Sequence, residues 1–118
     1  MNRFLLVASV LVAGIVSSAQ SPQRPPTVPG GNVDAGKKLY VSIGCYQCHG
    51  YEAQGSSATG PRLGPRSIPF ASFSRYVRQP TGQMPPYNAK VLADADLANI
   101  YAFVRSQPEP AKDIPLLK

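Results

Sequence analysis

The chain has 118 residues, of which 12 are Lys or Arg and 6 are Asp or Glu, so its side chains carry a net charge of +6. This length is typical of one domain, and a charged fraction of 15% is too low for a chain kept disordered by its charge. Two cysteines and one histidine exclude a small protein built on several disulfides and a metal site rich in histidine.

The first segment has the pattern of a secretory signal peptide. Arg3 precedes 13 apolar residues at 4–16, and small residues follow up to Ala19, where a cut is expected. The apolar run is shorter than the roughly 20 residues that span a bilayer. We therefore interpret residues 1–19 as a signal peptide and the mature protein as periplasmic or otherwise exported. The alternative is that residues 1–19 remain as an uncleaved N-terminal anchor. This segment would then be the one link of the protein to a membrane.

A Pro/Gly-rich linker is predicted over residues 20–33. Its first part reads QSPQRPPTVPGGN and contains four prolines and two glycines without a hydrophobic period. It either holds the next domain away from a membrane or partner or is a disordered terminus with no role. Residues 34–118 are then the folded domain. Its core is so small that a metal or a large buried group is expected to stabilise it.

Three segments of this domain have the periodicity of amphipathic helices. The first runs from a cap at Asp34 to about residue 43, and the second occupies 70–79 before a proline. The third begins at a cap on Asp94 and ends near 106–107, where two prolines follow. The glycines and prolines of 50–68 predict a loop, and no segment alternates as a strand does. The predicted class is all-α, with three main helices.

Between the first helix and the loop stands Cys45-Tyr46-Gln47-Cys48-His49, the C-x-x-C-H signature of c-type haem attachment. Two thiols at this spacing can form thioethers on one side of a porphyrin, and the next residue then offers an imidazole to the iron. Three other interpretations are a structural disulfide, a thioredoxin-like redox pair and a zinc site. The redox pair normally belongs to a βαβ context, and zinc requires a fourth ligand.

Met84 is the one methionine left after removal of a signal peptide. It lies 35 residues after His49, in the loop sequence TGQMPPY, and not on an apolar helical stripe. The alternative role is that of a core gap-filler. As a second axial ligand, its thioether would raise the haem potential, as suits an electron carrier.

These motifs occur in an order that resembles class I (mitochondrial-type) bacterial monohaem cytochromes c over residues 33–107. The matching segments are Asp34-Ala35-Gly36 with Tyr40, Cys45-x-x-Cys48-His49-Gly50, Gly60-Pro61-Arg62-Leu63, Met84-Pro85-Pro86 and the helix from Leu97 to Phe103. The Pro-rich stretch before residue 33 is not part of the family's core.

The resemblance implies a small class I fold with loops around one haem c, bound covalently through Cys45 and Cys48. His49 and Met84 would be the iron ligands. The Pro61 carbonyl would orient the His49 ring, and Leu63 would pack on the haem face. Gly36 and Tyr40 would cross Phe103 of the last helix.

The implied function is single-electron transfer without catalysis, by a free monomeric carrier. Alternatives are a cytochrome subunit of a periplasmic dehydrogenase or oxidase, and a haem enzyme or gas sensor with an open iron position. The basic excess either steers docking to an acidic redox partner or is an ordinary solvated surface. Arg62 or Arg78 is a candidate partner for the haem propionates. The chain contains no run of Lys and Arg residues, so nucleic acid binding is not expected.

Overall fold

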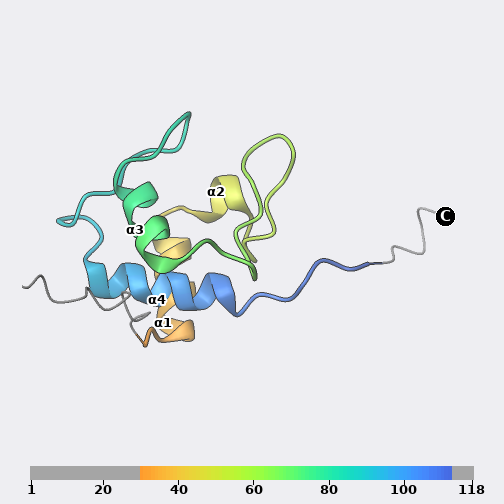
Figure 1. The fold of residues 1–118 in the computed structure, drawn as a ribbon, viewed down its shortest axis with the longest axis horizontal. Helices are drawn as coiled ribbons and strands as arrows, with labels where there is room; N and C mark the ends of the chain where they lie inside the picture. The colour runs from red at the N-terminus through yellow and green to blue at the C-terminus, as the bar shows by residue number, and fades with distance from the viewer. Residues whose placement is uncertain (1–29, 113–118) are drawn as a thin grey trace, which may run out of the picture.

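The computed structural model describes residues 30–112. The signal peptide predicted for 1–19 lies outside this range, as do most of the predicted linker and residues 113–118. The described part contains four helices and no strand, which confirms the predicted all-α class. The helices, labelled in Figure 1, are α1 (Val33–Ser42), α2 (Tyr46–His49), α3 (Phe70–Arg78) and α4 (Asp94–Arg105).

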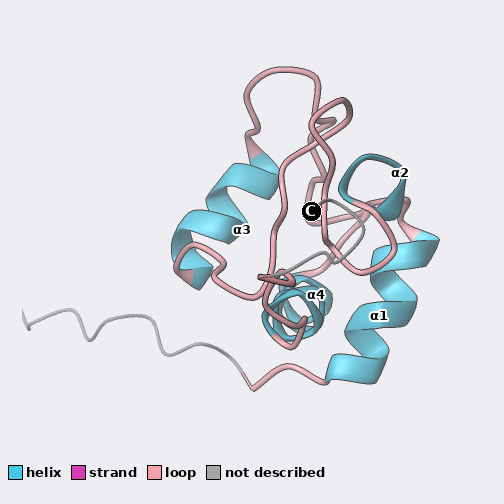
Figure 2. Ribbon diagram, turned by 90° about the vertical axis from the view of Figure 1, so that its right-hand side faces the viewer, coloured by secondary structure: helices cyan, strands magenta, loops and turns pink. Residues whose placement is uncertain are grey.

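Helix α4 is the centre of the arrangement. Figure 2 shows it end-on, with α1 on one side and α3 on the other, and both helices contact it. One long loop, residues 50–69, joins α2 to α3, and another, residues 79–93, joins α3 to α4. None of the helices between residues 30 and 112 has the length and apolar character that crossing a membrane requires. The three longer helices thus form a scaffold, and the predicted site residues lie on α2, just before it, or on the two loops.

The contact between α1 and α4 requires a glycine. A Cβ atom on Gly36 would run into the backbone carbonyl of Asn99 and lie 3.0 Å from the Cβ of Phe103. One turn later the rings of Tyr40 and Phe103 pack with their centroids 5.1 Å apart and their planes tilted by 54°. Tyr40 is fully buried and Phe103 is 3% exposed. The predicted crossing of the first and last helices is therefore present in the fold.

Helix α3 joins α4 through an aromatic cluster. The ring of Tyr101 lies 5.2 Å from that of Phe70 and 5.1 Å from that of Phe73. Its hydroxyl donates a hydrogen bond of 2.9 Å to the carbonyl oxygen of Ile68, so its buried polar atom has a partner. The predicted apolar stripes of both helices form this core.

The predicted helix caps are wrong by one or two residues. Asn32 caps α1, and its side-chain oxygen accepts from the Ala35 amide over 2.8 Å, while Asp34 lies in the first turn. Ala93 is the cap residue of α4 and makes no side-chain hydrogen bond, so Asp94 also lies in a first turn. Both carboxylates still stand where the helix dipole favours negative charge. Asp94 instead binds an arginine of α3, as described below.

Candidate functional site

Helix α2 is a single turn that brings the two cysteines and the histidine together. The His49 amide donates to the Cys45 carbonyl oxygen over 3.1 Å. Positions three apart on such a turn are neighbours, so the side chains of Cys45 and Cys48 start from the same side. Cys45 is half-buried, Cys48 is exposed, and both are free thiols. The turn therefore presents two thiols to one edge of a bound group, as two thioether bonds require.

The His49 side chain is buried and oriented. Its exposed fraction is 8%, and its Nδ1 lies 2.8 Å from the carbonyl oxygen of Pro61. A carbonyl oxygen can only accept, so the neutral ring carries its proton on Nδ1. This tautomer leaves the lone pair of Nε2 available, and Nε2 makes no hydrogen bond to residues 30–112. The arrangement is that of a histidine prepared to bind a metal, with a hydrogen bond behind it.

A tight turn at residues 56–61 holds this partner in place. Thr59 donates from its hydroxyl to the Cys48 carbonyl oxygen over 2.7 Å, which ties the turn to α2. Gly60 lies close to the imidazole, and a Cβ atom on it would come within 3.2 Å of Nδ1. The close approach of Gly60 lets the next residue, Pro61, reach the ring. The role of Thr59 was not predicted, because its partner is a backbone atom 11 residues away.

The protonation of Cys45 bears on the redox-pair interpretation. Burial raises the pKa of the Cys45 thiol to about 11. Redox-active Cys-x-x-Cys pairs rely on a thiol whose pKa is lowered, so that a thiolate forms near neutral pH. Cys45 stays protonated there, which argues against a thioredoxin-like function.

The other predicted site residues are half-buried apolar side chains at the edge of the core. Leu63, on the loop after α2, and Met84, on the loop after α3, both pack against the buried cluster, as do Cys45, Tyr46 and Tyr87. These side chains come from three separate segments and keep part of their apolar surface outside the core. They differ from Pro61, which is exposed and acts through its backbone.

The donor set fits haem c. An imidazole nitrogen and a thioether sulfur are the axial pair of electron-transferring cytochromes, and two thiols are the attachment points. The unpartnered Nε2 of His49 and the half-buried apolar side chains agree with a flat apolar group that contains a metal. Cys45, Cys48 and His49 would attach it, and Leu63 and Met84 are candidates for its apolar surroundings and second ligand.

The two arginines considered as propionate partners have protein partners. Arg62 donates to the carbonyl oxygens of Gly64 and Pro108, over 3.2 and 3.3 Å. Arg78 binds Tyr87 and Asp94. Nothing in these contacts assigns either guanidinium to a cofactor.

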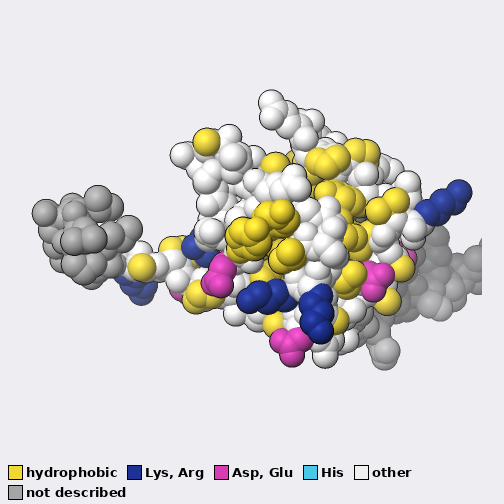
Figure 3. Space-filling model, turned by 180° about the vertical axis from the view of Figure 1, so that it is seen from behind, with side chains coloured by type: hydrophobic (Ala, Val, Ile, Leu, Met, Phe, Trp, Pro, Cys, Tyr) yellow, Lys and Arg dark blue, Asp and Glu magenta, His cyan; other side chains and the backbone are white. Residues whose placement is uncertain are grey.

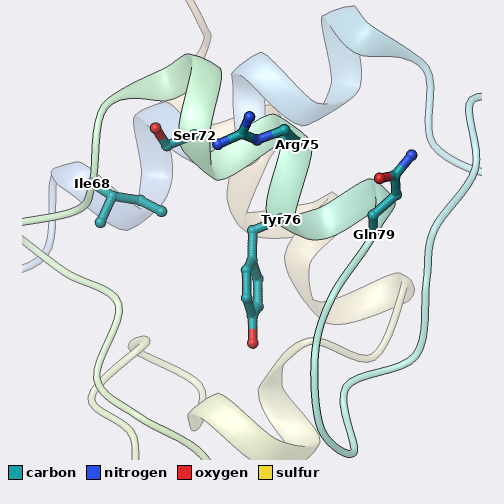
Figure 4. A pocket seen from close by; sticks show the side chains of 5 residues that line it. All are labelled: Ile68, Ser72, Arg75, Tyr76 and Gln79. Carbon is teal, nitrogen blue, oxygen red and sulfur yellow. The ribbon is translucent and has the colours of Figure 1, made fainter.

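One pocket of about 430 Å³ lies along the solvent-facing side of α3. Its lining residues are Ile68, Ser72, Arg75, Tyr76 and Gln79, shown in Figure 4. In this view the Tyr76 ring points away from α3, and its hydroxyl bonds Thr81 of the following loop, with 3.0 Å between the two hydroxyl oxygens. None of the five lining residues is a predicted site residue.

Comparison with known proteins agrees with the resemblance noted in the sequence. Residues 31–104, more than half of the chain, match the family described as "Cytochrome C oxidase, cbb3-type, subunit III". One relative is the cytochrome c subunit of 4-cresol dehydrogenase (hydroxylating) from Pseudomonas putida. It is 29% identical over 110 residues, which cover 93% of this chain and 88% of the relative. No solved structure gives a significant match. As an electron-transfer domain with one covalent haem c on the Cys45–Cys48 pair, the chain thus belongs to the cytochrome c family of cbb3-type oxidase subunit III.

Proposed function

We propose that this cytochrome is exported and carries single electrons between redox proteins, with His49 and Met84 as the two axial ligands of its iron. The observation that supports this most is the hydrogen bond of 2.8 Å from the His49 ring to Pro61, which leaves Nε2 free to coordinate. When bound, haem supplies a reversible one-electron couple, and His/Met ligation places it at a high potential.

In this proposal the protein works by keeping its site closed and dry. Met84 takes the position at which a substrate or gas would otherwise bind. Pro85 and Pro86 follow it directly and stiffen the backbone beside the thioether. Leu63 and the half-buried Tyr87 pack at the edge of the core from two different loops, where they would cover the site and limit water access. A site of this kind changes little between its two oxidation states, which suits electron transfer without chemistry.

Carbon monoxide binding to the reduced protein tests this closed site. The wild-type protein is expected to bind carbon monoxide weakly, because Met84 would already fill the second axial position of the iron. The Met84→Ala variant is expected to bind it tightly. Val91→Ala is the matched control, since Val91 is on the same loop but 64% exposed, and should behave as wild type. Tight binding by the wild type would contradict the carrier and favour a haem enzyme or gas sensor.

A second candidate function is that of a dedicated subunit of an exported dehydrogenase. The relative in Pseudomonas putida supports it, because that protein is named as a cytochrome c subunit of a dehydrogenase and matches over most of both chains. Under this proposal the electron donor is the partner dehydrogenase itself.

The two candidates differ in how the protein exists in its cells. A subunit is expected to copurify with a dehydrogenase in a fixed ratio and to elute with it in gel filtration at physiological salt. A free carrier is expected to elute as a monomer of about the chain's own mass. Elution as a monomer, with no dehydrogenase among cross-linked products, would contradict the subunit role.

The proposal also includes the location of the protein and its docking surface. Export rests on the signal peptide pattern of residues 1–19 and on the family assignment. Figure 3 shows one face on which hydrophobic side chains gather, with Lys and Arg interspersed with Asp and Glu around them. We propose that the basic excess of the chain favours an acidic redox partner by raising the encounter rate.

A further inference from the structure

The loop of residues 79–93 carries Met84, and its hydrogen bonds lie on either side of that residue, among them a long contact of 3.5 Å from the Tyr87 hydroxyl to the Ile43 carbonyl oxygen. Residues 82–86 make no hydrogen bond to any other residue of 30–112. Three residues before Met84, the Thr81 carbonyl oxygen accepts from the Tyr76 hydroxyl over 3.2 Å. Three residues after it, the Tyr87 amide donates to the carbonyl oxygen of Val77 over 3.1 Å. The position of the thioether therefore depends on what fixes the loop on either side.

One side chain connects the beginning, the middle and the end of this loop. Arg78 is the last residue of α3 and Asp94 is the first residue of α4, so they flank the loop. Nη1 of Arg78 donates to the Tyr87 carbonyl oxygen over 2.8 Å, and Nη2 lies 2.6 Å from Oδ1 of Asp94. The Tyr87 backbone is thus held through both its amide and its carbonyl by two consecutive residues, Val77 and Arg78.

The two contacts of Arg78 are not equal in strength. The Asp94 side chain is 83% exposed, so water and salt screen the ion pair and it contributes little. The Arg78 side chain is only 18% exposed, and its bond to Tyr87 is partly buried. A charged donor in such a place makes a stronger hydrogen bond than a neutral one. Of the two contacts of Arg78, the bond to Tyr87 should therefore restrain the loop more.

We infer that Arg78 is a positioning residue for Met84, which keeps the loop of residues 79–93 closed over the site through its bond to the Tyr87 carbonyl. This inference rests on the proposed ligation by Met84. Without the guanidinium, the loop should open more often, and the thioether should be displaced more easily by an added ligand. Removal of Arg78 should thus change the competition at the iron without any change in the attachment through Cys45 and Cys48.

Imidazole binding to the oxidised, haem-loaded protein measures this competition. Imidazole must displace the thioether, so its apparent affinity reports how easily the loop opens. In Arg78→Leu we expect the affinity to rise about tenfold, since a partly buried bond to a charged donor is lost. The weak near-red absorption band of sulfur-ligated ferric haem should also lose intensity. Arg75→Leu is the matched control, because Arg75 lies on the same last turn of α3 and is exposed, and should bind imidazole as wild type does.

Two further variants separate the contacts and guard against a protein that fails to fold. Asp94→Asn removes only the exposed ion pair and should change the affinity less than twofold. Arg78→Lys keeps the charge and can satisfy one of the two partners, so it should give an intermediate rise of about threefold. If Arg78→Leu yields no haem-loaded protein, the imidazole affinity of Arg78→Lys decides whether Arg78 positions the loop.

The outcomes distinguish this inference from the proposed function. If wild-type protein has the near-red band and the Arg78 variants bind imidazole as wild type does, Arg78 has no positioning role although Met84 is a ligand. If wild-type protein lacks the band, Met84 is not a ligand, and both proposals are overturned. A rise in Arg78→Leu with no rise in Arg75→Leu supports the inference.

Discussion

The His49 imidazole is held by neighbours that act on its different parts. Pro61 accepts from Nδ1, Gly60 lies close to the ring, and Thr59 ties the turn that contains both to the Cys48 carbonyl. A hydrogen bond behind a metal-binding imidazole increases its basicity, which favours the oxidised iron. The geometry of this turn should therefore influence the reduction potential.

Substitution of Gly60 tests this influence. In Gly60→Ala the new Cβ would lie 3.1 Å from the Cys48 carbonyl oxygen and 3.2 Å from the His49 ring, so the turn must shift away. The bond to Pro61 should lengthen, and the reduction potential in a redox titration should rise by roughly 30 mV, where 59 mV is a tenfold change for one electron. Ser57→Ala is the control, since Ser57 is exposed on the same turn. An unchanged or lower potential in Gly60→Ala would contradict the argument.

Tyr40 connects the scaffold to the residue after His49. Its hydroxyl donates to the Gly50 carbonyl oxygen over 2.8 Å, and the side chain is fully buried. Burial is the main cause that raises the pKa of Tyr40 above its ordinary value of 10.0. The folded protein thus binds this proton more tightly than the unfolded chain does. The resulting stability is complete below pH 10 and is lost as the pH rises further.

The Tyr40→Phe variant tests both parts of this argument. At pH 7 its free energy of unfolding should fall by about 1 kcal/mol, because one buried hydrogen bond is lost. Between pH 10 and 11 the wild type should lose stability more steeply than the variant. The measurement is denaturant unfolding of the haem-loaded protein at several pH values. Parallel curves for the two proteins in this alkaline range would show that Tyr40 does not titrate with unfolding.

At the scale of the elements, the crossing of α1 and α4 is the contact that a single atom would most disturb. In Gly36→Ala the added methyl group meets the Asn99 carbonyl, and neither helix backbone can move aside at low cost. The free energy of unfolding should fall by about 3 kcal/mol, as for an overpacked core. Lys37→Ala, at an exposed position of the same helix, should change it by less than about 0.5 kcal/mol. Equal stability of the two variants would contradict the close approach.

The helices themselves followed from the sequence, but their ends did not. Apolar periodicity and prolines located α1, α3 and α4, because these signals are local. The choice of Asn32 over Asp34 as a cap depends on backbone angles and on a contact with α4. The side-chain oxygen of Asn32 accepts from the Ala35 amide, and the Asn32 backbone amide donates to Oδ1 of Asn99 over 2.8 Å. Helix α2 is a single turn and too short to show a period.

At the scale of the whole molecule, the site combines a local motif with contacts between distant segments. The pairing of Cys45, Cys48 and His49 is visible in five consecutive residues, and the bond to Pro61 was expected from the family resemblance. The contact of Arg78 with Tyr87 and Asp94 was not expected, because it depends on how the loop after α3 returns to α4. Patterns of residue type contain no signal for a bond to a backbone carbonyl nine residues away.

The charge of the molecule gives a prediction that does not require its partner. Removal of residues 1–19 takes away Arg3 and leaves 11 basic and 6 acidic residues, so the protein should attract an anionic redox reagent. The bimolecular rate constant for electron exchange with an anionic iron cyanide complex should fall severalfold as salt rises from about 10 mM to about 0.5 M, because screening shortens the range of the charges. A neutral reagent is the control and should show no such dependence. A rate that rises with salt for the anionic reagent would contradict attraction.

The most direct test of the account is the near-red absorption spectrum of the oxidised, haem-loaded protein, because the account depends on sulfur ligation by Met84. We expect the weak band of a sulfur-ligated ferric haem in wild-type protein and in Val91→Ala, and its complete loss in Met84→Ala. A wild-type spectrum without this band, or a Met84→Ala spectrum that retains it, would contradict ligation by His49 and Met84.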